Sequence, residues 1–168
     1  HALKDSVTPS DLKDKSISVA HLPADPNSPT EVEDRILQPE QPSLIATEEE
    51  IRQFFVRYRE RFSQRDGDGF LSLFASKAVQ NGKDGFDEIA KIYSDFFEKS
   101  QELRYHIEDM KIDIYQNAVE ARGHYKIVQR EEKGRTKVVW TGNVRWILVR
   151  ENGALRIRFL DFNPQKSP

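Results

Sequence analysis

The chain has 168 residues, which suits one domain, because domains usually run to roughly 100–150 residues. Ten Phe, five Tyr and two Trp are enough aromatic residues to build a core, and no run approaches the ~20 apolar residues of a membrane span. The absence of Cys excludes disulfide bonds, thiol catalysis and zinc sites with Cys ligands. A net charge of −2 gives no case for nucleic-acid binding, which favours a strongly basic domain.

Residues 1–46 differ in composition from the rest of the chain. They hold six of the eight prolines, and eight acidic residues against four basic ones. Proline at this density blocks helices, and few apolar residues offset the entropy of ordering. We predict an acidic, Pro-rich linker, or an extended arm that docks through Ile36, Leu37, Leu44 and Ile45. The first residue is not Met and no signal peptide is visible, so we interpret the chain as a fragment of a longer protein or a processed product.

The domain itself begins with a helix signal at Thr47. Thr47 and Glu50 have the spacing of a capping box, in which each residue satisfies a backbone N–H of the other. Apolar residues then recur at helical spacing to about Ser63. These residues are Ile51, Phe54, Phe55, Tyr58 and Phe62.

Two more helices are predicted before residue 100. The glycine-containing run 65–69 ends the first helix, and Asp68 is placed to cap a short second helix that carries the apolar residues of 70–74. A loop through residues 81–82 leads to a third helix at about 85–99.

The sequence from Leu103 alternates with a period of two, which indicates strands. The apolar residues change parity between Ile107 and Met110, so we predict a β-bulge near Glu108–Asp109. Three further strands follow, separated by turns at 116–117, 132–134 and 151–153. Their apolar residues alternate over 119–127, 138–148 and 155–159.

Consecutive hairpins predict an antiparallel sheet, and the Asn152-Gly153 pair is a strong hairpin signal. The fold class is therefore α+β, with three N-terminal helices packed on one face of a bent four-stranded antiparallel sheet.

Four stretches carry a resemblance to a known superfamily. They are 54–58 (FFVRY), 66–74 (DGDGFLSLF), 81–89 (NGKDGFDEI) and 144–157 (VRWILVRENGALRI). Over about residues 47–163 the chain resembles the nuclear transport factor 2-like superfamily, in particular the SnoaL-like, polyketide-cyclase-like domains. The resemblance implies a cone-shaped, cystatin-like α+β roll and a domain at 47–165.

The chain is also similar to accessory domains that follow bacterial cell-envelope enzymes such as L,D-transpeptidases. This similarity implies a periplasmic or envelope location and a parent protein larger than the chain.

The resemblance implies a pocket inside the cone. Tyr58 and Tyr93 lie on the helix stripes that would face it, and Trp140 and Trp146 lie on the apolar face of one strand, either as core or as a ligand platform. Asp161 shares the parity of the apolar residues before it, which places it at the pocket's mouth.

Two functions follow from this pocket. The first is a non-catalytic binding or interaction module that holds a small apolar ligand or positions a neighbouring domain. The alternative is a small isomerase, dehydratase or cyclase that uses Tyr58 and Asp161. Residues 75–80 lack the acid that isomerase-type members carry there, so we assign no catalytic residue.

The opposite face of the sheet is predicted to be basic. Its candidate residues are Arg122, His124, Lys126, Arg145, Arg156 and Arg158. This face is either solvated or meets an acidic partner, such as a second copy in a homodimer or a neighbouring domain.

No metal site or cofactor is predicted. The run 66–69 suggests a calcium loop, but aligning Gly69 with the loop's sixth position puts Ala75 where a bidentate Glu is required. His106 and His124 do not have the spacing of paired metal ligands.

Overall fold

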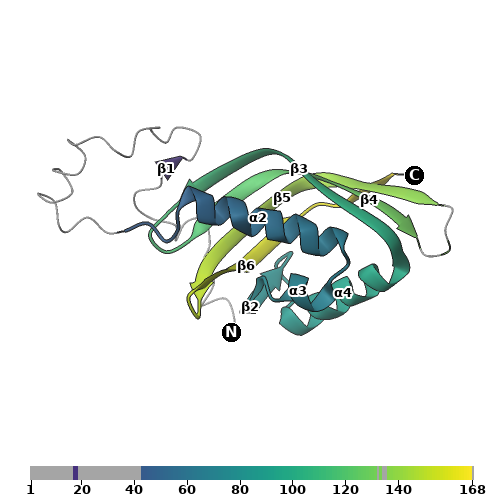
Figure 1. The fold of residues 1–168 in the computed structure, drawn as a ribbon, viewed down its shortest axis with the longest axis horizontal. Helices are drawn as coiled ribbons and strands as arrows, with labels where there is room; N and C mark the ends of the chain where they lie inside the picture. Colours follow the sequence, from purple (N-terminus) through teal and green to yellow (C-terminus); the bar gives the residue numbers. More distant parts are fainter. Residues whose placement is uncertain (1–16, 19–42, 132, 134–135, 168) are drawn as a thin grey trace, which may run out of the picture.

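The computed structural model describes residues 17–18, 43–131, 133 and 136–167. Its elements, in chain order, are β1 (Ile17–Ser18), α2 (Glu48–Ser63), α3 (Gly67–Leu71), β2 (Phe74–Gln80), α4 (Phe86–Lys99), β3 (Ser100–Ile114), β4 (Val119–Glu131), β5 (Lys137–Glu151), β6 (Ala154–Phe162) and β7 (Gln165–Ser167). Figure 1 shows the long strands β3 to β6 curving around α2, with α3 and α4 packed together beside it. None of the helices in the described part of the chain combines the length and apolar character that crossing a membrane requires.

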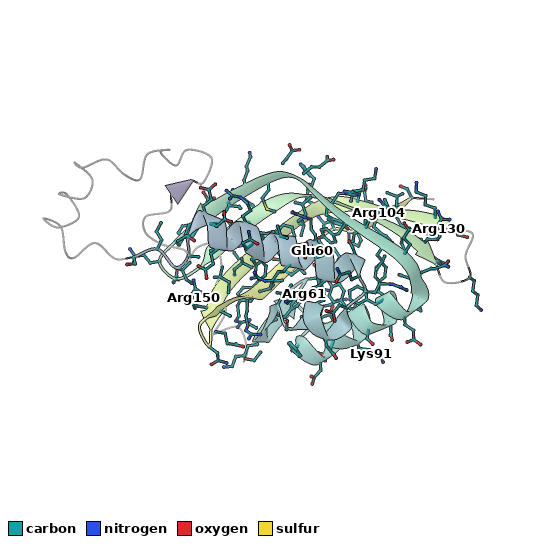
Figure 2. The ribbon with its side chains drawn as sticks, viewed as in Figure 1. Glu60, Arg61, Lys91, Arg104, Arg130 and Arg150 are labelled. Carbon is teal, nitrogen blue, oxygen red and sulfur yellow. The ribbon has the colours of Figure 1, made fainter. Side chains whose placement is uncertain are left out.

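Helix α2 begins where the capping pattern predicts. The Thr47 side chain accepts a hydrogen bond of 3.1 Å from the Glu50 backbone N–H. The Glu50 carboxylate in turn accepts bonds of 2.7 and 2.9 Å from Arg150 on β5. The Arg150 hydrogen bond is the main reason that the pKa of Glu50 lies below its usual value. This ion pair joins the start of α2 to the end of β5, and Figure 2 shows Arg150 beside that helix end.

The end of the N-terminal segment docks on the domain. The Ile45 N–H donates to the Tyr115 carbonyl at 2.9 Å, and Arg150 donates to the Ile45 carbonyl at 2.6 Å. Leu44 and Ile45, two of the four anchors named for an extended arm, pack against the core of this domain. The other two anchors, Ile36 and Leu37, lie outside the described residues. Strand β1 pairs with the β3 edge at Ile114 and Asp113.

The sheet is mixed and larger than the sequence predicts. Within the described residues its strand order is β1-β3-β4-β5-β6-β2, and β7 pairs with β5. The four predicted strands and their antiparallel pairing are confirmed. Strand β2, however, runs parallel to β6 and was not predicted, because it pairs with a strand about eighty residues further along the chain. Turn 132–134 lies mostly outside the described residues.

The region around α3 differs from the prediction in two details. Asp66, not Asp68, caps α3, since its carboxylate accepts a 3.0 Å hydrogen bond from the Gly69 N–H. Phe74 begins β2 instead of ending the second helix. Phe70 lies on α3, as predicted, and is fully buried. The third predicted helix is α4, with Gly85 at its N-cap.

The predicted bulge in β3 is present. The pairing of β3 with β4 shifts between Glu108 and Lys111, and Asp109 has a φ of 54°. The extra residue returns the apolar side chains after the bend to the core face.

A second bulge, in β6, was not predicted. Ile147 and Leu148 of β5 pair with Phe159 and Ile157 of β6, which makes Arg158 the extra residue of the bulge. The side-chain alternation therefore reverses after Ile157. Phe159, predicted to face the core, packs on the other side of the sheet with Ala118 and Ile147.

Aromatic rings fill the space between the helices and the sheet. The Trp146 ring lies 4.9 Å from Phe55 and 5.7 Å from Tyr58, measured between ring centroids, in edge-on arrangements that aromatic pairs favour. Phe55, Tyr125, Trp146 and Ile157 are all buried, as predicted. Trp146 is completely inaccessible at 0% exposure, so it anchors α2 to the sheet.

Replacing Trp146 by Ala should lower the free energy of unfolding by about 3–5 kcal/mol, because it leaves a large cavity in the core. Trp140→Ala is the matched control, since Trp140 is only partly buried and should cost clearly less. Urea denaturation of both variants measures the difference. Equal losses would show that Trp146 does not anchor the core.

Candidate functional site

Two hollows lie on opposite faces of the sheet. One, of about 380 Å³, opens between the helices and the sheet, and we call it the cone cavity. The other, of about 770 Å³, is an open depression on the opposite face, and we call it the outer hollow. Each contains residues that the sequence singles out, but the two differ in chemistry.

The cone cavity is mainly aromatic. Helix α2 supplies Tyr58 and Phe62, α4 supplies Tyr93, and β3 and β4 supply Tyr105 and Tyr125. Further apolar walls come from Phe96, Ile127, Trp140 and Phe162. Ile92, at 40% exposure, is the one large apolar side chain that is exposed in the described residues, and it lines this cavity. Such a lining suits an apolar ligand.

Tyrosine hydroxyls provide the polar groups inside the cone cavity. The Tyr93 hydroxyl donates to the Gln80 side chain at 2.7 Å. The hydroxyls of Tyr58 and Tyr105 lie 3.5 Å apart, at the limit of a hydrogen bond. Each hydroxyl carries one hydrogen, so this pair uses one hydrogen between its members and retains a second. Because Tyr58 donates in this pair, the retained hydrogen is that of the Tyr105 hydroxyl, and Tyr105 lines the cavity.

Burial keeps these tyrosines protonated. It raises the pKa of Tyr58 to about 12 and that of Tyr125 to about 12. Burial also raises the pKa values of Tyr93 and Tyr105 well above the ordinary tyrosine value. Near neutral pH the cavity therefore offers uncharged hydroxyl donors. Its other ionisable lining groups, Asp95 and Lys99, are exposed.

The C-terminal segment forms one wall of the cone cavity. The Tyr125 hydroxyl donates to the Asn163 carbonyl at 3.4 Å, and Pro164 lines the cavity. Gly142 permits this approach, because a Cβ atom there would overlap the Asn163 carbonyl oxygen. The Lys166 ammonium lies 5.5 Å from the centre of the Trp140 ring.

The structure places the predicted pocket residues at three different locations. Tyr58, Tyr93 and Trp140 line the cone cavity. Trp146 lies behind the lining in the core. The placement of Asp161 at the mouth is wrong, because the β6 bulge turns Asp161 to the outer face, where it lies 3.3 Å from Arg145.

Tyr105 and Tyr125 are the two lining tyrosines that the sequence analysis did not assign to the site. Both lie on the apolar parity of their strands, so they were treated only as core. A tyrosine on a buried face needs a partner for its hydroxyl, whereas a phenylalanine does not. Two tyrosines on neighbouring apolar faces are therefore a signal of a polar feature within the core.

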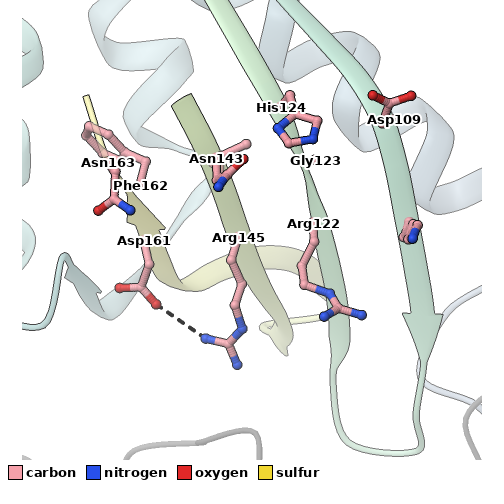
Figure 3. Close-up of a pocket in the computed structure, with 11 residues that line it drawn as sticks. Asp109, Arg122, Gly123, His124, Asn143, Arg145, Asp161, Phe162 and Asn163 are labelled. Carbon is pink, nitrogen blue, oxygen red and sulfur yellow. Dashed lines mark hydrogen bonds and ion pairs between the residues drawn. The ribbon is translucent and has the colours of Figure 1, made fainter. Parts of the chain in front are cut away.

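The outer hollow is lined by charged and amide side chains. Arg122 and His124 from β4 lie beside Asn143 and Arg145 from β5, with Asp161 on β6, as Figure 3 shows. Arg145 donates to Glu120 at 2.7 Å and to Asp161 at 3.3 Å. Arg145 is therefore held in place by two carboxylates.

The predicted basic face is smaller than expected. Arg122, His124 and Arg145 line the outer hollow, and Lys126 follows on the same face of β4. Arg156 and Arg158 instead contact the β2 side of the sheet. Arg156 donates to the Ser72 carbonyl, and Arg158 donates to the Lys77 carbonyl and lies 4.5 Å from the Phe159 ring centre.

Among the residues that the structure describes, no three His, Asp or Glu side chains gather closely enough to hold a metal ion. The 66–69 run, considered above as a calcium loop, begins helix α3. Open space surrounds Gly67, so a side-chain methyl group at this position would lie more than 4 Å from the atoms of described residues outside its own stretch of the helix.

Comparison with known proteins identifies the fold. A family model described as a SnoaL-like domain matches residues 43–161, well over half of the chain. No curated protein sequence is significantly similar.

Three solved structures illustrate the structural similarity. A proposed scytalone dehydratase from Novosphingobium aromaticivorans has a TM-score of 0.65 at 14% identity, covering 71% of this chain and 85% of that protein. Aln2 from a Streptomyces species has a TM-score of 0.57 at 24% identity, with coverages of 71% and 93%. A nuclear transport factor 2-like superfamily protein from Salmonella enterica has a TM-score of 0.61 at 18% identity, with coverages of 68% and 88%. At these identities the similarity concerns the fold.

Alkaline pH should destabilise the domain through its buried tyrosines. The unfolded chain releases a tyrosine proton near pH 10, whereas folded Tyr58 keeps it until about pH 12. The contribution of Tyr58 to the free energy of unfolding should therefore be constant below about pH 10 and fall between about pH 10 and 12, by about 2–3 kcal/mol. Urea denaturation across this range measures the loss. Tyr58→Phe should show a shallower decline, and an identical decline would contradict the assignment.

Gly142→Ala should lower the free energy of unfolding by about 1–3 kcal/mol, because the new methyl group displaces the chain at Asn163. Gly67→Ala is the control, since open space surrounds that position. Thermal unfolding compares the two variants. A stable Gly142→Ala protein with unchanged amide spectra at 163–166 would contradict the proposed wall.

Proposed function

The chain is a member of the SnoaL-like domain family, and we propose that it is a binding module whose cone cavity holds a small, largely apolar ligand. The observation that carries this proposal is the lining itself, in which aromatic rings surround tyrosine hydroxyls that burial keeps uncharged. The cavity volume of about 380 Å³ falls in the range of roughly 300–1,000 Å³ that is typical of small-molecule sites.

The tyrosine pair gives the cavity a means of orienting its ligand. Tyr58 and Tyr105 share one hydrogen bond and retain one O–H. A ligand with a carbonyl or other acceptor oxygen at one end would accept that hydrogen, while its apolar body contacts Phe62, Ile127 and Trp140. We therefore expect a preference for ring compounds with one acceptor oxygen over pure hydrocarbons.

The geometry supports binding more than the alternative isomerase, dehydratase or cyclase. That alternative needs Tyr58 and Asp161 in one pocket, but Asp161 pairs with Arg145 on the other face of the sheet. A tyrosine with a pKa of about 12 donates hydrogen bonds at neutral pH, but it is a poor general base because its anion is scarce.

We also propose that the domain serves a larger bacterial envelope protein as an accessory module. The composition of residues 1–46, rich in proline and acidic residues, supports a tether to a neighbouring domain. The hypothesis that the outer face contacts a second copy or a neighbouring domain stays a prediction.

Two ligands of similar shape test the proposal for the cavity. The chain should bind 2-acetylnaphthalene about tenfold more tightly than 2-ethylnaphthalene, because only the ketone can accept the free tyrosine O–H. Quenching of tryptophan fluorescence measures both affinities, since Trp140 lines the cavity. Because Tyr105→Phe alone would free the Tyr58 O–H for the ketone, the test uses the double variant Tyr58→Phe/Tyr105→Phe. This double variant should abolish the difference in affinity without changing the affinity for the hydrocarbon.

Tyr115→Phe is the matched control, because Tyr115 packs in the small cluster outside the cavity. It should leave both affinities unchanged. Failure of both compounds to bind the folded wild-type chain would reject the proposed cavity function. Equal binding of the two compounds would reject the role of the tyrosine pair.

A further inference from the structure

Three basic residues lie in one row across the outer face of the sheet. Lys111 of β3 is paired in register with Arg122 of β4, and Arg122 is paired with Arg145 of β5. Asp161 of β6 ends the row. Like charges placed directly opposite each other on neighbouring strands destabilise a sheet. This row therefore carries an unfavourable interaction that an anion would relieve.

The neighbouring carboxylates neutralise the three basic residues of the row to different extents. Glu120 and Asp161 bind Arg145 at 2.7 and 3.3 Å. Arg122 reaches only Asp113, at 3.8 Å, and its side chain remains 55% exposed. Among the described residues Lys111 is without an ion pair, and Arg122 has a single long one.

The outer hollow surrounds the Lys111–Arg122 end of the row. Its lining contains three permanent cations, Lys111, Arg122 and Arg145, against the carboxylates of Asp109 and Asp161. Figure 3 shows the Arg122 and Arg145 side chains extending side by side from neighbouring strands. His124 and Asn143, which are paired across the same two strands two register positions further along, add hydrogen-bonding groups on the same face.

We infer that the outer hollow is a second ligand site, which binds an oxyanion group, phosphate or carboxylate, of a small molecule. The planar guanidinium of Arg122 presents two parallel N–H donors that match two oxygens of such a group. Lys111 adds a second positive charge from the adjacent strand, whose backbone lies about 5 Å from that of β4. Arg145 has a buried Nη2 without a hydrogen-bond partner among the described residues, so its own donors are not all used.

This site is independent of the cone cavity. The two hollows lie on opposite faces of the sheet, and their linings share only Phe162. A ligand-binding failure in one hollow therefore does not decide the other.

Isothermal titration of the full chain with inorganic phosphate and, separately, with citrate tests the inference. Both titrations are done at low ionic strength, because exposed charges are screened over about 8 Å at physiological salt. Arg122→Gln and Lys111→Gln should each weaken binding by about tenfold, since each removes a charge-assisted contact. Both side chains are exposed, so the variants should fold as the wild type does.

Arg130→Gln is the matched control. Arg130 lies on the same strand, is 46% exposed, and has a comparable long ion pair, 3.7 Å from Glu102. Figure 2 shows Arg130 close to Arg104. Both arginines form ion pairs with Glu102, so the Glu102 carboxylate already neutralises part of their charge. Removing Arg130 changes the net charge as Arg122→Gln does, but it should not change oxyanion binding to the outer hollow.

The outcomes separate the sources of the oxyanion. Binding of phosphate alone assigns the site to phosphorylated ligands, binding of citrate alone assigns it to carboxylates, and binding of both assigns it to the shared chemistry. Binding of neither at low ionic strength overturns the inference. Equal weakening by Arg122→Gln and Arg130→Gln also overturns it, because the effect would then reflect net charge only.

Discussion

The alternation of side chains along β-strands is the constraint on which the other features of this domain depend. Each strand sends successive residues to opposite faces, so a single extra residue exchanges the two faces for everything that follows. The β3 bulge at Asp109 keeps the apolar residues on the core side through a sharp bend. The β6 bulge at Arg158 sends Phe159 and Asp161 outward. Together the bulges separate an aromatic cavity from a charged outer face.

The sequence predicts what is encoded locally. The Thr47 cap, the stripe of α2 and the β3 bulge were all legible, because each leaves a periodic pattern or a change of parity within a few residues. Strand β2 could not be predicted in this way, because its partner β6 is distant in the chain. The β6 bulge was hidden because Phe159 continues the apolar alternation in the sequence, although it packs in a second small cluster. Asp161 was misplaced for this reason alone.

The candidate site was therefore predictable in part. Tyr58, Tyr93 and Trp140 could be found from helix and strand faces, but the pairing of Tyr58 with Tyr105 joins α2 to β3 and requires the folded arrangement. The positions of the arginines on the sheet could also be predicted only in part. Strand parity suggested one basic surface, whereas Arg156 and Arg158 bind backbone carbonyls at the β2 side. A charged side chain long enough to reach a backbone carbonyl on a neighbouring segment is not located by its Cβ direction alone.

The parallel pairing of β2 with β6 has a consequence for synthesis of the chain. Residues 74–80 leave the ribosome well before residues 157–160, yet Phe74 pairs with Ile157 and the Ile157 N–H donates to the Leu73 carbonyl at 2.7 Å. Until the last long strand emerges, the backbone of β2 has no strand to pair with. The nascent chain must therefore protect this exposed edge for most of its translation, when strand edges invite aggregation. Completion of β6 closes the domain in one late step.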